Sequence, residues 1–136
     1  MGSIGRWITV GAVGLALSGC GGALVLKREK DVAAPQNFRP RGVQTLWKIT
    51  GHLESEFLQD VSSGYERVKR RVLHVQINGE EVIRGQVSNE GAGELSGEYG
   101  GLPVDAICSS EVKTVNWMEV RCVIVIDNER TVTLVM

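Results

Sequence analysis

The chain is poor in the residues from which metal and cofactor sites are usually built. Its 136 residues include two histidines and three cysteines, and aromatic residues make up only 5% of it. No cysteines or histidines have the close spacing of a zinc site. His52 and His74 fall at predicted solvent-facing positions of different strands. We therefore expect two exposed histidines, no metal site and no cofactor.

Motifs for nucleophilic catalysis are also missing. The serine pairs at 62–63 and 109–110 lie outside any Gly-x-Ser-x-Gly motif and are typical of turns or strand ends. The glycine-rich segment 91–97 leads into a predicted strand, whereas phosphate binding uses the exposed N–H groups of a helix start. The sequence thus predicts no catalytic residues and a noncatalytic protein.

No large excess of charge of one sign is present, since the formal net charge is −1. Residues 27–41 carry a local charge of +3, while the chain from Val43 onward holds fourteen acidic and nine basic residues, a net −5. Nucleic-acid binding needs a dense positive face, so this distribution argues against it. The basic segment is either a solvated linker or a contact for anionic lipid headgroups.

The N-terminus has the features of an export signal. Arg6 precedes an uncharged run from Trp7 to Gly19, which ends in small residues. The quartet Leu17-Ser18-Gly19-Cys20 resembles the lipobox of bacterial lipoproteins, whose cysteine is lipidated and becomes the first residue of the mature chain. The resemblance implies a signal peptide over 1–19 and attachment to membrane lipid through Cys20.

The same resemblance implies a location. Gly21, and not aspartate, follows the cysteine, which in lipoproteins of the enterobacterial type implies the outer membrane, facing the periplasm. Two alternatives stay open. The uncharged stretch Trp7–Leu26 is long enough to span a bilayer, although its glycines weaken a helix. The signal could also be cleaved to release a secreted protein.

The odd number of cysteines fits this interpretation. If Cys20 carries lipid, then Cys108 and Cys122 remain as a pair in an oxidising compartment. We expect a disulfide between them, and two buried free thiols are the alternative.

The remaining chain divides into a predicted tether over 20–42 and a β domain over 43–136. The tether contains Pro35 and Pro40 and shows no sustained hydrophobic period. Strict apolar alternation from Trp47 to Phe57 favours a half-buried strand, and a helix from Leu53 is the alternative.

Three hairpins follow. We expect the first to turn through a three-residue loop ending at Gly79, because a two-residue Asn78-Gly79 turn would oppose Val75 to Val82 and spoil the common face. Two-residue turns are expected at Gly100-Gly101, pairing Tyr99 with Leu102, and at 127–128. The predicted fold is an all-β antiparallel meander of six or seven strands, a small sandwich or barrel.

Two features are candidates for binding. Arg67, Lys69 and Arg71 would point the same way from a strand, and Trp117 stands in a predicted polar loop. The alternatives are a charged strand edge that resists aggregation and a core aromatic residue.

The sequence predicts a membrane-anchored envelope lipoprotein that binds an envelope protein or glycan, or supports an assembly. A periplasmic inhibitor or a pilotin-like secretion helper is the alternative, and a small envelope hydrolase is less favoured.

Overall fold

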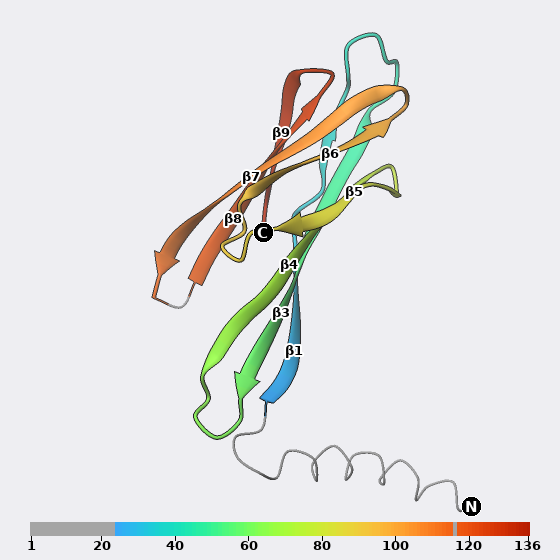
Figure 1. Cartoon of the computed structure of the whole chain (residues 1–136). Helices are drawn as coiled ribbons and strands as arrows, with labels where there is room; N and C mark the ends of the chain where they lie inside the picture. Colours follow the sequence, from blue (N-terminus) through green and yellow to red (C-terminus); the bar gives the residue numbers. More distant parts are fainter. Residues whose placement is uncertain (1–23, 116) are drawn as a thin grey trace, which may run out of the picture. The chain divides into compact units, whose positions relative to one another are not determined.

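The computed structural model describes residues 24–115 and 117–136, and all of their regular structure is β (Figure 1). Within these residues no helix has the length and apolar character needed to cross a membrane. The nine strands are β1 (Leu24–Val32), β2 (Gln36–Phe38), β3 (Trp47–Asp60), β4 (Glu66–Ile77), β5 (Glu80–Val87), β6 (Gly93–Tyr99), β7 (Leu102–Thr114), β8 (Trp117–Ile126) and β9 (Glu129–Val135).

The strands form two separate sheets. The five-stranded sheet has the order β1-β3-β4-β5, with β2 also paired to β3, and the four-stranded sheet has the order β6-β7-β8-β9. The described residues fall into two compact units: 24–27 with 57–67, and 28–56 with 68–136. The prediction of an all-β antiparallel fold is confirmed. Of the two predicted architectures, a sandwich and a barrel, the structure is a sandwich.

The core lies in the larger unit and draws on both sheets. Trp47, Ile49 and Leu53 of β3 belong to the same buried cluster as Ile124 of β8 and Leu134 of β9. Each sheet therefore buries one apolar face, which is the main stabilising contribution in such a fold. The alternating pattern from residue 47 is confirmed as a strand, not a helix.

The β4–β5 hairpin corrects the predicted loop. Ile77 pairs with Glu80, so Asn78 and Gly79 form a two-residue turn, with φ of 52° and 86°. Positive φ at both positions is what a type I′ turn requires. Val75 nevertheless lies opposite Ile83, because Val82 is left without a partner in a β-bulge. The bulge, and not a longer loop, keeps the apolar residues on one face.

The second hairpin follows the predicted register, and the third turns at the predicted residues. Tyr99 pairs with Leu102 across the glycine turn. Ile126 pairs with Glu129 across Asp127-Asn128, and a register shift again follows the turn. The unpartnered residue there is Thr131, whose hydroxyl donates to the Ile124 carbonyl at 2.8 Å. Two hairpins thus use the same combination of a two-residue turn and a nearby bulge.

The bulge in β5 depends on a glycine in β6. A Cβ added at Gly97 would lie 1.9 Å from the carbonyl oxygen of Val82. Only a residue without a side chain leaves room for this approach of one backbone to another.

A disulfide joins Cys108 of β7 to Cys122 of β8. The two residues are direct cross-strand partners and both are buried. The predicted pairing is confirmed. Cys20 and the signal-peptide and lipobox predictions lie outside the described residues.

The predicted tether over 20–42 is wrong for its central part, which forms β1 and β2. Ala33, between these strands, is 1% exposed and donates its N–H to the Gly51 carbonyl at 2.9 Å. All nine residues of β1 are exposed, so backbone pairing in the five-stranded sheet holds the strand without an apolar face. A hydrophobic pattern could not have revealed it.

The smaller unit contains the turn between β3 and β4. The Asp60 carboxylate accepts hydrogen bonds from the N–H and the hydroxyl of Ser62, at 2.9 and 2.7 Å. These bonds hold the pKa of Asp60 below its ordinary value, and the bond from the hydroxyl is the largest cause. Lys27 pairs with Glu66 at 3.2 Å within the same unit.

Candidate functional site

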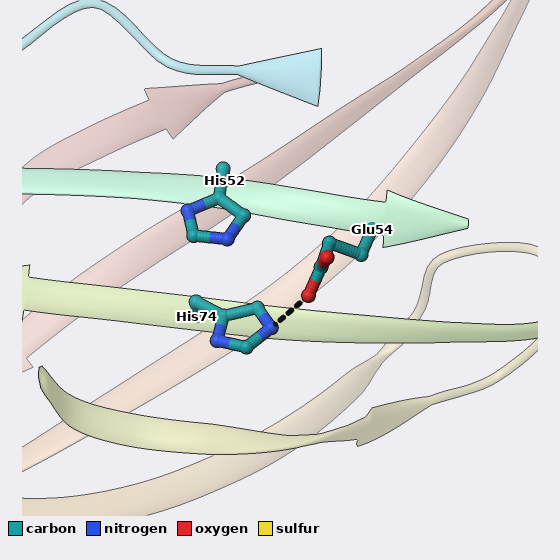
Figure 2. Close-up of side chains that lie close together, drawn as sticks. All are labelled: His52, Glu54 and His74. Carbon is teal, nitrogen blue, oxygen red and sulfur yellow. Dashed lines mark ion pairs between the residues drawn. The ribbon is translucent and has the colours of Figure 1, made fainter. Parts of the chain in front are cut away.

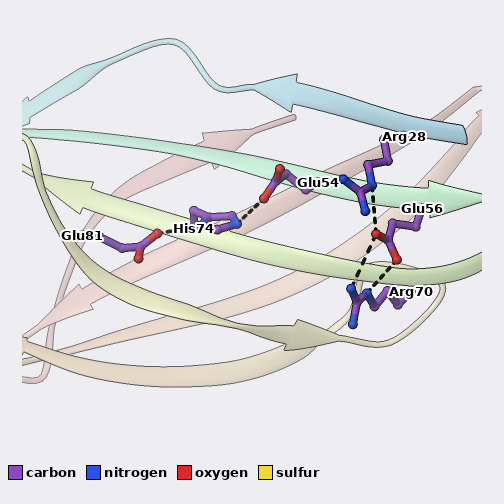
Figure 3. A network of polar contacts seen from close by, with 6 residues as sticks. All are labelled: Arg28, Glu54, Glu56, Arg70, His74 and Glu81. Atoms are coloured by element: carbon purple, nitrogen blue, oxygen red, sulfur yellow. Dashed lines mark hydrogen bonds and ion pairs between the residues drawn. The ribbon is translucent and has the colours of Figure 1, made fainter. Parts of the chain in front are cut away.

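The face of β3 and β4 that turns away from the core carries a cluster of polar side chains. Successive residues of a strand point to opposite faces, so His52, Glu54 and Glu56 share the side opposite Ile49 and Leu53. Arg70 of β4 lies beside Glu56, and His74 of β4 lies beside Glu54 (Figure 3). We call these five side chains, together with Arg28 of β1 and Glu81 of β5, the polar face.

His74 is the buried centre of the polar face. Only 8% of it is exposed, and its ring lies between two carboxylates. The Nδ1 atom is 2.5 Å from Glu81 Oε1, and the Nε2 atom is 2.5 Å from Glu54 Oε1. The hydrogen bond with His74 is the main cause that lowers the pKa of Glu81.

The two nitrogen atoms of His74 are not equally satisfied. The Nδ1 contact has hydrogen-bond geometry, whereas Nε2 has no hydrogen-bond partner despite the short distance to Glu54. Among the described residues, Nε2 of His74 is the one buried side-chain nitrogen or oxygen in this condition. Such an atom is costly unless something supplies the missing interaction.

His52 lies directly against His74. The two rings are stacked, with centroids 4.3 Å apart and planes 11° from parallel (Figure 2). Burial, followed by the neighbouring His74, lowers the pKa of His52. A neutral His52 ring retains a nitrogen lone pair that is free to act as a ligand.

The predicted exposure is wrong: His74 is buried and His52 is half-buried. The two histidines do lie on different strands and on the face away from the core, as predicted, but these strands are neighbours in the sheet. Together with Glu54, they place one possible ligand atom each within 4.8 Å of one another. Two imidazoles and a carboxylate are a set of donors that first-row transition metals favour.

An ion-pair cluster forms the second part of the polar face. Glu56 accepts from Arg70 Nε at 2.8 Å and from Arg28 Nε at 3.1 Å (Figure 3). The hydrogen bond from Arg70 is the largest cause that lowers the pKa of Glu56. A hollow of about 230 Å³ opens here, and its lining includes Arg84 and Val72. The hollow presents both signs of charge to solvent.

One signal in the sequence could have located the polar face. Contacts join Thr50 to Gln76, His52 to His74 and Glu56 to Arg70. Each pair is centred on position 63, within the segment Ser62-Ser63-Gly64. Treating that segment as a hairpin turn fixes the register and predicts every one of these neighbours.

The three residues of the predicted basic strand do not share one surface. Arg67 and Lys69 are exposed, Arg67 in the smaller unit and Lys69 in the larger. Arg71 is half-buried, donating to Ser55 Oγ and to the Asn89 carbonyl, both at 2.7 Å. Burial lowers the pKa of Arg71, although nearby carboxylates oppose the shift. Arg71 thus holds three segments together and is not a free surface cation.

Trp117 is the first residue of β8, not part of a loop as predicted. It is 55% exposed and pairs with Thr114 at the end of the β7–β8 hairpin. Val112 and Val115, at the same end, are 74% and 98% exposed. We call Val112, Val115 and Trp117 the apolar hairpin end. It is an exposed apolar surface on the larger unit.

Comparison with protein-family models, with curated proteins and with solved structures found no match for this chain.

Proposed function

We propose that the protein is a membrane-anchored lipoprotein of the bacterial cell envelope whose β-sandwich is a noncatalytic binding module for a partner protein. Two parts of this proposal rest on different residues. The anchoring part rests on Cys20 and the oxidised cysteine pair, and the binding part rests on the apolar hairpin end.

The disulfide supports the anchoring part. Disulfides persist in oxidising compartments, and the bridge between Cys108 and Cys122 is consistent with export. It uses two of the three cysteines in the chain. Cys20 is then the remaining thiol, and it stands in the lipobox-like quartet.

The apolar hairpin end is the observation that carries the binding part. Exposed valines and a tryptophan at one hairpin end cost free energy in water, and tryptophan is enriched where proteins bind one another. A partner protein that covers Trp117 and Val115 would remove this surface from solvent.

The anchoring part is tested with Cys20→Ala in cells. Mass spectrometry of the wild-type chain is expected to find Cys20 as the acylated first residue, and the variant is expected to leave the membrane fraction or to remain unprocessed and unacylated. Cys108→Ala is the control, because it changes a cysteine without touching the anchor. A Cys20→Ala chain that stays in the membrane with the same mature N-terminus would contradict lipidation.

The binding part is tested by photocrosslinking. A photoreactive residue at position 115 is expected to capture a discrete envelope protein, and Trp117→Ser is expected to reduce the yield several-fold. The same probe at Glu98, exposed on β6, is the matched control. Equal capture from both positions, or capture that Trp117→Ser leaves unchanged, would contradict a binding role for the apolar hairpin end.

A further inference from the structure

We propose that His52, Glu54 and His74 form a binding site for one divalent transition-metal ion, with zinc the best match. This inference rests on the polar face alone and does not depend on lipidation or on a partner protein. His52 and Glu54 are two residues apart on one face of β3, and His74 lies beside them on β4 (Figure 2).

The environment of His74 has the features of a histidine that coordinates a metal. Nδ1 is held by Glu81 at 2.5 Å, which leaves Nε2 as the coordinating atom. Histidine ligands of metals usually donate their other ring N–H to a carboxylate in this way. The Nε2 atom is buried, lacks a hydrogen-bond partner and is 2.5 Å from Glu54 Oε1.

The charges around His74 also favour a cation. A neutral imidazole carries one proton, so it can satisfy only one of the two flanking carboxylates. In the neutral tautomer with its proton directed to Glu81, the Nε2 lone pair would face the Glu54 carboxylate, 2.5 Å away. A metal ion bound between Nε2 and Glu54 would turn this repulsion into two coordinate bonds.

Binding requires small side-chain movements. Zinc bonds of about 2.0–2.1 Å in a tetrahedral site place two ligand atoms roughly 3.3 Å apart. The three atoms here are up to 4.8 Å apart, whereas Nε2 of His74 is 2.5 Å from Glu54 Oε1, so one distance must shorten and the other must lengthen. Nitrogen lone pairs lie in the ring plane, so His52 must rotate out of the stack. The backbones of β3 and β4 can stay in place, since the Glu54 side chain is 51% exposed and free to move.

The donor set indicates the class of ion. Calcium and magnesium prefer sites made of oxygen ligands, whereas two imidazoles with one carboxylate suit zinc and its first-row neighbours. Three protein ligands would leave the fourth tetrahedral position to water on the exposed side of Glu54. The ion would also cross-link β3 to β4.

The test is zinc titration of the full-length, detergent-solubilised chain without a histidine tag, in competition with a chromophoric chelator. We expect one zinc ion per chain. His52→Gln and Glu54→Gln are each expected to weaken binding by at least tenfold, and Glu81→Gln by roughly 10–100-fold as an outer-shell partner. Glu80→Gln is the matched control, since Glu80 is the exposed neighbour of Glu81 and is expected to leave the affinity unchanged.

A second measurement uses the wild-type chain alone, so its result does not depend on whether the variants fold. In the wild-type chain, zinc is expected to shift the ring nitrogen resonances of His52 and His74 in NMR spectra. The proposal is overturned if no saturable one-to-one binding occurs, or if the histidine resonances do not respond. Binding that survives both Glu54→Gln and His52→Gln would also overturn it, because the ion would then lie elsewhere, for example at Cys20.

Discussion

At the scale of single residues, the fold depends on a few positions where one backbone approaches another. Gly97 and Gly85 lie on facing strands, and each would bring a new Cβ close to the opposite strand. The atoms that a new Cβ would meet differ between the two positions. Gly97 faces the fixed carbonyl of Val82, whereas Gly85 faces the flexible end of the Leu95 side chain.

We predict that Gly97→Ala lowers the free energy of unfolding more than Gly85→Ala does. A Cβ at 1.9 Å from a carbonyl oxygen forces the backbone to move, and overpacking of this kind costs about 1–3 kcal/mol or more. The Leu95 methyl group, at 2.7 Å, can rotate away. Urea unfolding of the two variants measures the difference. Equal losses of unfolding free energy would contradict the prediction and show that the backbone at the Val82 bulge can shift at little cost.

Asp60 gives a second prediction at this scale. Its lowered pKa means that hydrogen bonding to Ser62 and Ser63 stabilises the turn only while the carboxylate is ionised. This contribution is complete above the ordinary aspartate pKa of about 4 and is lost as the pH falls through the lowered value.

Carboxyl titration by NMR is expected to show a pKa for Asp60 below its ordinary value. Ser62→Ala is expected to raise that pKa more than Ser63→Ala, because the hydroxyl bond from Ser62 is the largest cause of the shift and the hydroxyl bond from Ser63 is the smallest. Equal effects of the two variants would contradict this order.

At the scale of strands and hairpins, the turn residues could be read from the sequence but the bulges could not. Asn78-Gly79 identifies a turn because both residues tolerate positive φ. A regular two-residue turn would place Val75 opposite Val82, and this pairing can be avoided either by a longer loop or by a bulge in the strand. The sequence pattern is the same in both cases. The space left by Gly97, in a different hairpin, decides the outcome, and no local pattern contains that information.

The disulfide is the second feature at this scale. Cys108 and Cys122 are 14 residues apart, and closing a loop of this size stabilises a protein by about 3 kcal/mol in the chain-entropy model. We predict that replacing both cysteines with alanine lowers the free energy of unfolding by about that amount.

Denaturant unfolding with and without reducing agent checks this expectation. Reducing agent should bring the wild-type chain close to the variant and leave the variant unchanged. A wild-type chain as stable as the variant under oxidising conditions would contradict it.

At the scale of the whole molecule, the sequence indicated the fold class and the seven strands after residue 43, but it missed β1 and β2. Those strands carry no apolar alternation, because an edge strand can be held by backbone hydrogen bonds alone. The polar face was missed for a related reason. Its members fall at solvent-facing positions, and only the β3–β4 register brings them together.

We predict that a chain beginning at residue 43 is less stable than one beginning at residue 24. The shorter chain lacks the buried Ala33 and the pairing of β1 and β2 with β3. Thermal unfolding of both truncated proteins measures the loss. If the two proteins unfold at the same temperature, residues 24–42 contribute nothing to the domain.

The early start of β1 limits how far its first residue can lie from the bilayer. With Cys20 acylated as proposed, four residue steps separate it from Leu24, a reach of about 14 Å even when fully stretched. A flexible segment extending to residue 43 would have allowed roughly 80 Å. The first residue of β1 is therefore restricted to a thin shell above the headgroups, which a long flexible linker would not have imposed.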